Sequence, residues 1–259
     1  MSSDNLILNT LEPGIAELVL SQPARRNAIN AQMWADMPVK LAEAAALPGI
    51  KVLIVRGDGD HFASGADISE FEKLYSTKSS TKKISDNIAA GFKSMAEFPL
   101  PTIAQVRGAC VGGGCGFALC CDIRFADNTA LFAITPAKLG LVYPFSDVQR
   151  LIETVGIPNA KDMLFSARLI KAKRAEKMGL INKLFKPDDL AEGVIAYARK
   201  LTALSTQSAI VTKKMFAAYQ AGQSGENAQS MDWFLDGFSS ADFEEGYRAF
   251  LEKRKPEFR

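Results

Sequence analysis

Histidine is almost absent from this chain of 259 residues, which contains one, His61. A metal centre built from several histidines is therefore excluded, and any Ser-His-Asp or Cys-His device would have to use that residue. The sequence also lacks an apolar run of the ~20 residues that a membrane-spanning helix needs. Because 31 Lys and Arg are balanced by 29 Asp and Glu, the net charge of +2 is too small for a general nucleic-acid binder or a polybasic membrane binder.

Cysteine is confined to one short segment, where it occurs at Cys110, Cys115, Cys120 and Cys121. The spacing matches neither a paired C-x-x-C zinc pattern nor an iron–sulfur run, and it predicts small, buried, reduced side chains. The N-terminus lacks the basic cluster and apolar core of a secretory signal. The C-terminal Glu-Phe-Arg is not a peroxisomal signal, so we expect a cytoplasmic protein.

Short β-branched runs alternate with helical segments up to about Leu190. The expected strands span residues 17–20, 52–57, 102–107, 119–126 and 180–185. The expected helices span residues 30–47, 81–96, 145–155 and 172–178, and Pro38 is expected to kink or split the first of them. This alternation predicts an α/β core with parallel strands, in a chain long enough for one domain with a smaller appendage.

Beyond about Leu190 the strand signals stop, which predicts an α-helical C-terminal subdomain. Four apolar residues there fall on one helical face: Met231, Phe234, Leu235 and Phe238. This face either packs on the protein's own core or forms an oligomer interface. Earlier in the chain, a Ser-, Thr- and Lys-rich stretch at 75–83 has no apolar periodicity and is expected to be a mobile loop.

Two glycine-containing segments each connect an expected strand to an expected helix. They are His-Phe-Ala-Ser-Gly-Ala-Asp-Ile at 61–68 and the stretch 101–116, which ends in Val-Gly-Gly-Gly-Cys-Gly. Amide N–H groups at a helix N-terminus have no intrahelical acceptor, and glycine lets a ligand carbonyl approach closely. Two such loops facing each other would form an oxyanion hole. A nucleotide phosphate loop is not indicated, because no Gly-Lys-Ser/Thr follows and G-x-G-x-x-G is absent.

Several segments, in order along nearly the whole chain, resemble the signatures of the crotonase, or enoyl-CoA hydratase/isomerase, superfamily. They are Arg-Arg-Asn-Ala-Ile-Asn at 25–30, Phe-Ala-Ser-Gly-Ala-Asp-Ile at 62–68, Pro-Thr-Ile-Ala at 101–104, Val-Gly-Gly-Gly-Cys at 111–115, Cys-Asp-Ile at 121–123 and Phe-Leu-Glu-Lys-Arg-Lys at 250–255. The resemblance implies a spiral core of repeated ββα units over residues 1–190. It also implies a helical subdomain over residues 191–259 that assembles trimers, often paired into hexamers. The implied ligand is an acyl-CoA thioester.

The resemblance also assigns individual residues. Ala66 and Gly113 match the two backbone N–H donors that hold the thioester oxygen as it becomes enolate-like. The positions it implies for coenzyme A are Arg25, Arg26, Ala28, Ala66, Ile68, Phe250 and Lys253. The last two match a C-terminal pair that covers adenine and phosphate, frequently from a neighbouring subunit. No metal and no permanently bound cofactor is implied.

The chain departs from the family at both positions where hydratases have a catalytic glutamate. Alignment of the glycine run places the first at Gly116, and alignment of F-G-x-P-E-x-x-L-G places the second at Pro136, or at Ala137 after a slide of one residue. None of these residues can transfer a proton. Tyr143 falls where some members place a catalytic residue, including methylmalonyl-CoA decarboxylase-like proteins, which have a tyrosine there.

Three functions stay open. The chain is an acyl-CoA enzyme with chemistry other than standard hydration, a decarboxylase-like enzyme that uses Tyr143, or a CoA-ester-binding protein without turnover. The remaining polar residues near the glycine loops are expected to be structural. Asp147 is interpreted as a helix N-cap, Asp67 as a cap or buttress of its loop, and His61 as exposed and non-catalytic. Glu70 is interpreted as a surface residue that could instead face the acyl pocket.

Overall fold

The structure, a computed structural model, describes residues 5–258. A six-stranded sheet runs through its centre in the order β1-β2-β3-β4-β6-β9. Its strands are β1 (Leu6–Glu12), β2 (Ile15–Leu20), β3 (Val52–Gly57), β4 (Thr102–Val106), β6 (Ile123–Asp127) and β9 (Lys183–Phe185). The β1–β2 pair is antiparallel and all other neighbours are parallel, as the alternating pattern predicts.

A second, three-stranded sheet accounts for the spiral core expected from the sequence. It consists of β5 (Ala109–Val111), β7 (Leu131–Ala133) and β8 (Ile170–Lys171), in that order. β4 and β6 each lie in the large sheet, and the strand that follows each of them lies in the small one. Ala63 continues the small sheet through an isolated parallel bridge to Cys110. Each turn of the chain thus contributes to both sheets, which confirms the crotonase-like α/β fold.

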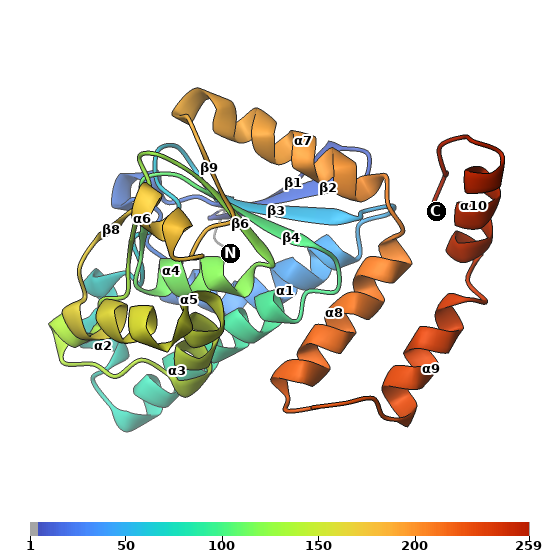
Figure 1. The fold of residues 1–259 in the computed structure, drawn as a ribbon. Coiled ribbons are helices and arrows are strands. Elements are labelled where there is room, and N and C mark those ends of the chain that lie inside the picture. Colours follow the sequence, from blue (N-terminus) through green and yellow to red (C-terminus); the bar gives the residue numbers. More distant parts are fainter. Residues whose placement is uncertain (1–4, 259) are drawn as a thin grey trace.

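Helices cover both faces of the large sheet (Figure 1). The core helices are α1 (Ala31–Ala45), α2 (Phe71–Leu74), α3 (Lys78–Ala96), α4 (Gly113–Cys120), α5 (Phe145–Ser166), α6 (Ala172–Lys177) and α7 (Leu190–Thr202). α7 covers one face and buries Leu190, Val194 and Ala198 against it. The larger core lies on the other face, where α1, α3 and α4 pack together.

The last three helices leave the core one after another: α8 (Thr206–Gln220), α9 (Ala228–Gly237) and α10 (Ala241–Leu251). α8 stands beside the core, and α9 and α10 lie beyond it at the edge of the molecule (Figure 1). None of the α9 residues is buried, and Phe234, Leu235 and Phe238 are each 55% exposed. Within the described chain the predicted apolar face of α9 therefore does not pack on its own core.

All four cysteines are free and buried, as predicted. Cys115 and Cys120 lie in α4, Cys121 ends that helix, and Cys110 lies in β5. Burial raises the pKa of the Cys110 thiol well above its ordinary value and that of Cys120 to about 12. These thiols therefore stay protonated at neutral pH and behave as small apolar side chains.

The prediction of a strand at 119–126 is wrong in its first half. Leu119 and Cys120 belong to α4, and the strand begins at Ile123. Every α4 residue after Gly113 is buried, so this helix has no polar face. A short helix that is apolar all round cannot be distinguished from a buried strand by periodicity.

The prediction of a mobile loop at 75–83 is also wrong, because α3 begins at Lys78. Thr77 caps the helix: its side chain accepts a hydrogen bond from the Ser80 backbone, and Ser80 bonds back to the Thr77 N–H. The Ser and Thr residues that resemble a loop thus form a capping box. Pro38 does not split the first helix, because α1 runs from Ala31 to Ala45 with Pro38 inside it.

Candidate active site

A cavity of about 1120 Å³ opens beside the N-terminus of α4. Three residues predicted for the chemistry line it together: Ala66, Gly113 and Tyr143. They come from three separate segments, namely the loop after β3, the first residue of α4 and the loop before α5. Ile68, predicted to contact coenzyme A, also lines the cavity and is 59% exposed.

The loop that carries Ala66 is fixed by backbone bonds on both sides of that residue. Ile29 N–H donates to the Gly65 carbonyl at 2.7 Å, and Asp67 N–H donates to the Ile29 carbonyl at 3.1 Å. The N–H of Ala66 itself has no acceptor among residues 5–258. An amide held between two bonded neighbours and left unpaired is a preorganised donor.

The second donor lies at the start of α4. Gly113 is the first helical residue, so its N–H has no intrahelical acceptor. A methyl group on Gly113 would lie 3.7 Å from the Ala66 nitrogen, which places the two amides side by side. Gly65, with φ +108°, needs glycine, because a side chain there would also lie 3.1 Å from the Val111 carbonyl oxygen. The two unpaired N–H groups therefore lie close together beside the cavity, as the two glycine-containing loops predict.

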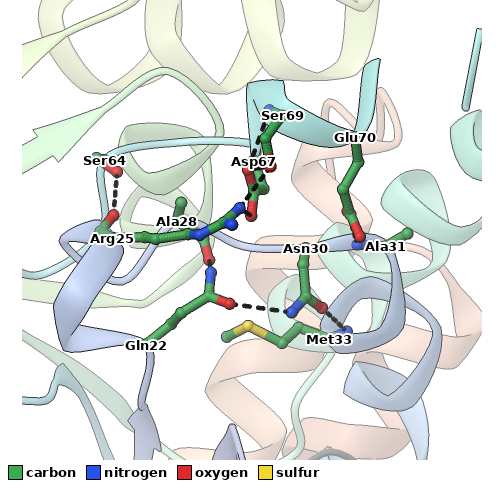
Figure 2. Close-up of polar contacts among 10 residues, drawn as sticks. All are labelled: Gln22, Arg25, Ala28, Asn30, Ala31, Met33, Ser64, Asp67, Ser69 and Glu70. Atoms are coloured by element: carbon green, nitrogen blue, oxygen red, sulfur yellow. Dashed lines mark hydrogen bonds and ion pairs between the residues drawn. The ribbon is translucent and has the colours of Figure 1, made fainter. Parts of the chain in front are cut away.

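The Arg25 side chain binds two residues that follow Ala66 in its loop (Figure 2). Its Nη1 lies 2.5 Å from Asp67 Oδ2 and 2.5 Å from Ser69 Oγ. Asp67 also accepts from the Ser69 N–H at 3.1 Å and caps the 3-10 helix at Ile68–Glu70, which confirms its predicted structural role. Burial raises the pKa of Asp67, but the hydrogen bonds from Ser69 and Arg25 outweigh burial, so its pKa is lowered overall.

Glu70 joins the loop to the start of α1 (Figure 2). Its Oε2 accepts a hydrogen bond from the Ala31 N–H at 2.8 Å, while Asn30 caps the helix by accepting from the Met33 N–H. Both alternatives for Glu70 are therefore wrong: in the described structure it neither lines the cavity nor stands free at the surface. Its carboxylate stabilises a helix N-terminus, where free N–H groups attract negative charge.

The other residues predicted for coenzyme A do not line the cavity of this chain. Arg26 adopts a left-handed conformation with φ 52°, and Ala28 is buried. Phe250 is 82% exposed near the end of α10, and Lys253 follows that helix with φ 55°. The structure therefore groups Ala66, Gly113, Tyr143 and Ile68 at one cavity and leaves Phe250 and Lys253 at the far edge of the protein.

Tyr143 fills space beside Gly116. A methyl group on Gly116 would lie 2.5 Å from the Tyr143 hydroxyl oxygen and 3.1 Å from Cζ of Phe92. The hydroxyl is enclosed and has no hydrogen-bond partner within residues 5–258. Burial and the nearby negative charge of Asp147 raise the pKa of Tyr143 well above its ordinary value of 10, so the hydroxyl stays protonated at neutral pH.

Asp147 is a site residue that sequence reasoning placed wrongly. Pro144, not Asp147, is the N-cap of α5, and the Asp147 carboxylate lies in the first turn. It is buried, lines the cavity and pairs with Arg150 Nη1 at 2.9 Å. Burial raises the pKa of Asp147, and Arg150 offsets that only in part. Capping preference is a local signal, whereas this burial depends on how α5 packs.

Sequence reasoning also missed an aromatic wall. Trp34 of α1 lines the cavity, and its ring meets Phe92 edge-on with centroids 5.0 Å apart and Phe117 with centroids 6.1 Å apart. The helical spacing of Met33, Trp34 and Met37 predicts burial but does not reveal which of them faces a cavity.

His61 differs from its predicted exposure. It is half-buried, and its Nδ1 accepts a hydrogen bond from the Ala109 N–H at 3.0 Å. This bond links the loop that carries Ala66 to β5, which leads into the glycine run. His61 therefore supports both loops of the site.

Comparison with known proteins extends over the whole chain. The family described as enoyl-CoA hydratase/isomerase matches residues 10–259. The crotonyl-CoA hydratase of Syntrophomonas wolfei is 32% identical over 266 residues, covering 100% of this chain and 99% of the relative. The short-chain-enoyl-CoA hydratase of Clostridium acetobutylicum is 31% identical, covering 99% of this chain and 98% of the relative.

Solved structures agree. A protein from Hyphomonas neptunium, described as an enoyl-CoA hydratase/isomerase family member, superposes with a TM-score of 0.95 at 41% identity, over 98% of this chain and 97% of the other. An enoyl-CoA hydratase/carnithine racemase from Magnetospirillum magneticum gives a TM-score of 0.94 at 30% identity, over 100% and 96%. The match over residues 10–259 and the 32% identity to a crotonyl-CoA hydratase show the family. The chain belongs to the enoyl-CoA hydratase/isomerase family of the crotonase superfamily, whose substrates are acyl-CoA thioesters.

Proposed function

We propose that this protein stabilises the enolate of an acyl-CoA thioester with the backbone N–H groups of Ala66 and Gly113. The observation that carries the proposal is that both amides border one cavity and lack an acceptor within the described residues. Negative charge that develops on the thioester oxygen would be held by two fixed donors, an effect commonly worth ~3 kcal/mol per donor. Coenzyme A enters as part of the substrate, without a metal or a second cofactor.

The reaction we propose is not hydration by a glutamate pair. By the family resemblance, Gly116 takes the first glutamate position and Pro136 or Ala137 the second, and a side chain on Gly116 would collide with the Tyr143 hydroxyl. The carboxylates in the described cavity wall already have partners, since Glu97 pairs with Lys93 and Asp147 with Arg150, while Glu153 accepts hydrogen bonds from two glutamine side chains. The site therefore favours a reaction that needs a proton donor more than a strong base.

Tyr143 is the proton donor in this proposal. Its raised pKa keeps the hydroxyl protonated, and its unpaired state leaves the hydrogen free for substrate. A neutral hydroxyl can orient an acyl oxygen or deliver a proton to an enolate carbon.

Decarboxylation is the second candidate, favoured by the combination of an oxyanion hole with an unpaired hydroxyl. In this reaction the bond between the α-carbon and a carboxylate breaks, and its electron pair forms the enolate. Carbon dioxide leaves, and a proton from Tyr143 or solvent then forms the new C–H bond. No base is required, because the leaving group takes no proton.

Coenzyme A binding and assembly complete the proposal. Arg25, Arg26, Ala28 and Ile68 would contact the coenzyme from this chain, and Phe250 and Lys253 would cover the nucleotide of a neighbouring subunit. The exposed apolar face of α9 supports a homotrimer, or a hexamer of two trimers, built by residues 191–259 around the 1–190 core. We propose a cytoplasmic location for this assembly. Among the described helices, none has both the length and the apolar character to cross a membrane.

Purified protein should be incubated with enoyl-, 3-hydroxyacyl- and malonyl-type CoA thioesters, and the products followed by mass spectrometry. We expect turnover of at least one thioester and no enzymatic hydration of crotonyl-CoA. Crotonyl-CoA hydration at an ordinary enzymatic rate would contradict the roles given to Gly116 and Pro136. Tight binding without turnover would select the CoA-ester-binding protein instead, and failure to bind any thioester would overturn the proposal.

A further inference from the structure

Two side chains that line the cavity each have a buried hydrogen-bond donor without an acceptor among the described residues. The indole Nε1 of Trp34 and the hydroxyl of Tyr143 are both closed off from solvent, and neither has a hydrogen-bond partner in the described part of the chain. Both residues line the cavity. An unpaired buried polar group costs folding free energy, so two at one site indicate a partner that arrives with the ligand.

The indole ring of Trp34 lies between α3 and α4. A methyl group on Gly91 of α3 would lie 2.8 Å from Cε3, and one on Gly113 of α4 would lie 3.5 Å from Cζ2. Because Cζ2 belongs to the ring edge that carries Nε1, the N–H edge is the one nearer α4 and the oxyanion hole. Phe92 and Phe117 pack edge-on against the ring and hold it in this orientation.

The Tyr143 hydroxyl lies beside Gly116, three residues beyond Gly113 and so ~4.5 Å further along the helix axis. Phe92 connects the two donors, since it packs against the Trp34 ring and its Cζ also lies next to Gly116. An acyl chain that extended from the oxyanion hole along the first turn of α4 would therefore run past the side chains of both Trp34 and Tyr143.

We propose that Trp34 is a specificity residue whose indole N–H, together with the Tyr143 hydroxyl, binds an oxygen atom on the acyl chain near C3. The inference rests on the proposed acyl-CoA function and adds the substrate class: thioesters with a hydroxyl, keto or carboxylate oxygen at that position. An indole N–H can only donate, and a protonated tyrosine hydroxyl is free to donate. A plain hydrocarbon chain would leave both donors unpaired, which is how a polar pocket rejects a ligand that lacks the oxygen.

Calorimetric titration with butyryl-CoA, 3-hydroxybutyryl-CoA and malonyl-CoA tests this inference, with products checked by mass spectrometry. We expect at least one oxygenated thioester to bind about 10-fold more tightly than butyryl-CoA. Tighter binding of 3-hydroxybutyryl-CoA would identify a hydroxyl as the bound oxygen, and tighter binding of malonyl-CoA would identify a carboxylate. Equal affinity for all three would overturn the inference but leave the proposed function intact, whereas failure to bind any of them would overturn both.

Trp34→Phe should reduce the preference for the oxygenated thioester by about 3- to 10-fold. Any change in the affinity for butyryl-CoA measures the altered packing alone, because butyryl-CoA has no oxygen for the indole N–H to bind. Trp233→Phe on α9 is the matched control and should keep the full preference. If Trp34→Phe does not fold, the remaining tryptophan of the Trp233→Phe protein can be replaced by benzothienylalanine, which keeps the ring shape and removes the N–H. A full preference in either Trp34 variant would overturn the assignment.

Discussion

The hydroxyl oxygen of Tyr143 lies 2.5 Å from the point where a side chain on Gly116 would begin. The same space can therefore hold either a side chain at position 116 or the Tyr143 hydroxyl, but not both. The family resemblance places a glutamate at the position of Gly116. In this chain the Tyr143 hydroxyl occupies the space beside Gly116.

Gly116→Ala should destabilise the protein by about 2 kcal/mol, because the new methyl group overpacks the Tyr143 hydroxyl. The same substitution in a Tyr143→Phe background should cost less, since the clashing oxygen is gone. Thermal unfolding of the four proteins measures the coupling, and Gly237→Ala is the control, because nothing lies within 4 Å of a methyl group there. Additive changes would contradict the shared volume.

Tyr143→Phe should separate stability from activity. We expect kcat to fall by about 100-fold if the hydroxyl donates a proton. The same variant should be equally stable or melt about 2–4 °C higher, because an unpaired buried hydroxyl is removed. Kinetics on the active thioester and calorimetric melting are both needed. Unchanged kinetics would remove Tyr143 from the mechanism.

Gly113→Ala should impair catalysis more than folding. The new methyl group would lie 3.7 Å from the Ala66 nitrogen, in the space where the thioester oxygen is expected. We predict about a 100-fold loss in kcat/KM. The melting temperature should stay close to that of the parent protein, since φ at this residue is not positive and Trp34 is 3.5 Å away. Parent-like kinetics would place the oxyanion elsewhere.

The Arg25–Asp67 pair should make stability depend on acid pH. Because the pKa of Asp67 is lowered from its ordinary value of 3.8, the ionised carboxylate stabilises the fold above that value, and the contribution is lost as the pH falls through the lowered pKa. Asp67→Asn should therefore melt below the parent protein at neutral pH. The difference in melting temperature between the two proteins should become smaller as the pH falls below 3.8. A difference that does not change with pH would show that the charge of Asp67 does not contribute to stability.

Phe234→Glu should disrupt assembly. Phe234 is 55% exposed on α9 and packs edge-on against Phe238, with ring centroids 5.2 Å apart. A charge within this apolar face should convert a trimer of 28.1 kDa chains to monomers, as measured by light scattering during gel filtration. Asp232→Asn on the same helix is the control. A parent protein that is already monomeric would refute the assembly proposal.

Sequence reasoning was most successful for the two glycine-containing loops, which it predicts to face each other. Gly65 has φ +108° and Gly113 begins α4, and both residues line one cavity. It failed where a residue's role depends on distant packing. Asp147 resembles a cap locally, yet it becomes a buried cavity residue because α5 packs against the rest of the site.

Trp34 illustrates the same limit. Its helical spacing predicts a core position, and it is indeed 2% exposed. Its proximity to Gly113 arises only when α1, α3 and α4 meet, and contacts between residues so far apart in sequence leave no local pattern. Thr77 shows the opposite case, because its capping box with Ser80 is a local signal although the surrounding composition resembles a loop.

The enclosed cysteines have a practical consequence for labelling. All four thiols are buried, and burial raises the pKa values of Cys110, Cys120 and Cys121, so a maleimide should leave them untouched in the folded protein. A cysteine introduced at Val142, which lines the cavity and is 93% exposed, would then be the one reactive thiol. A fluorophore attached there would report ligand entry without removal of any native cysteine.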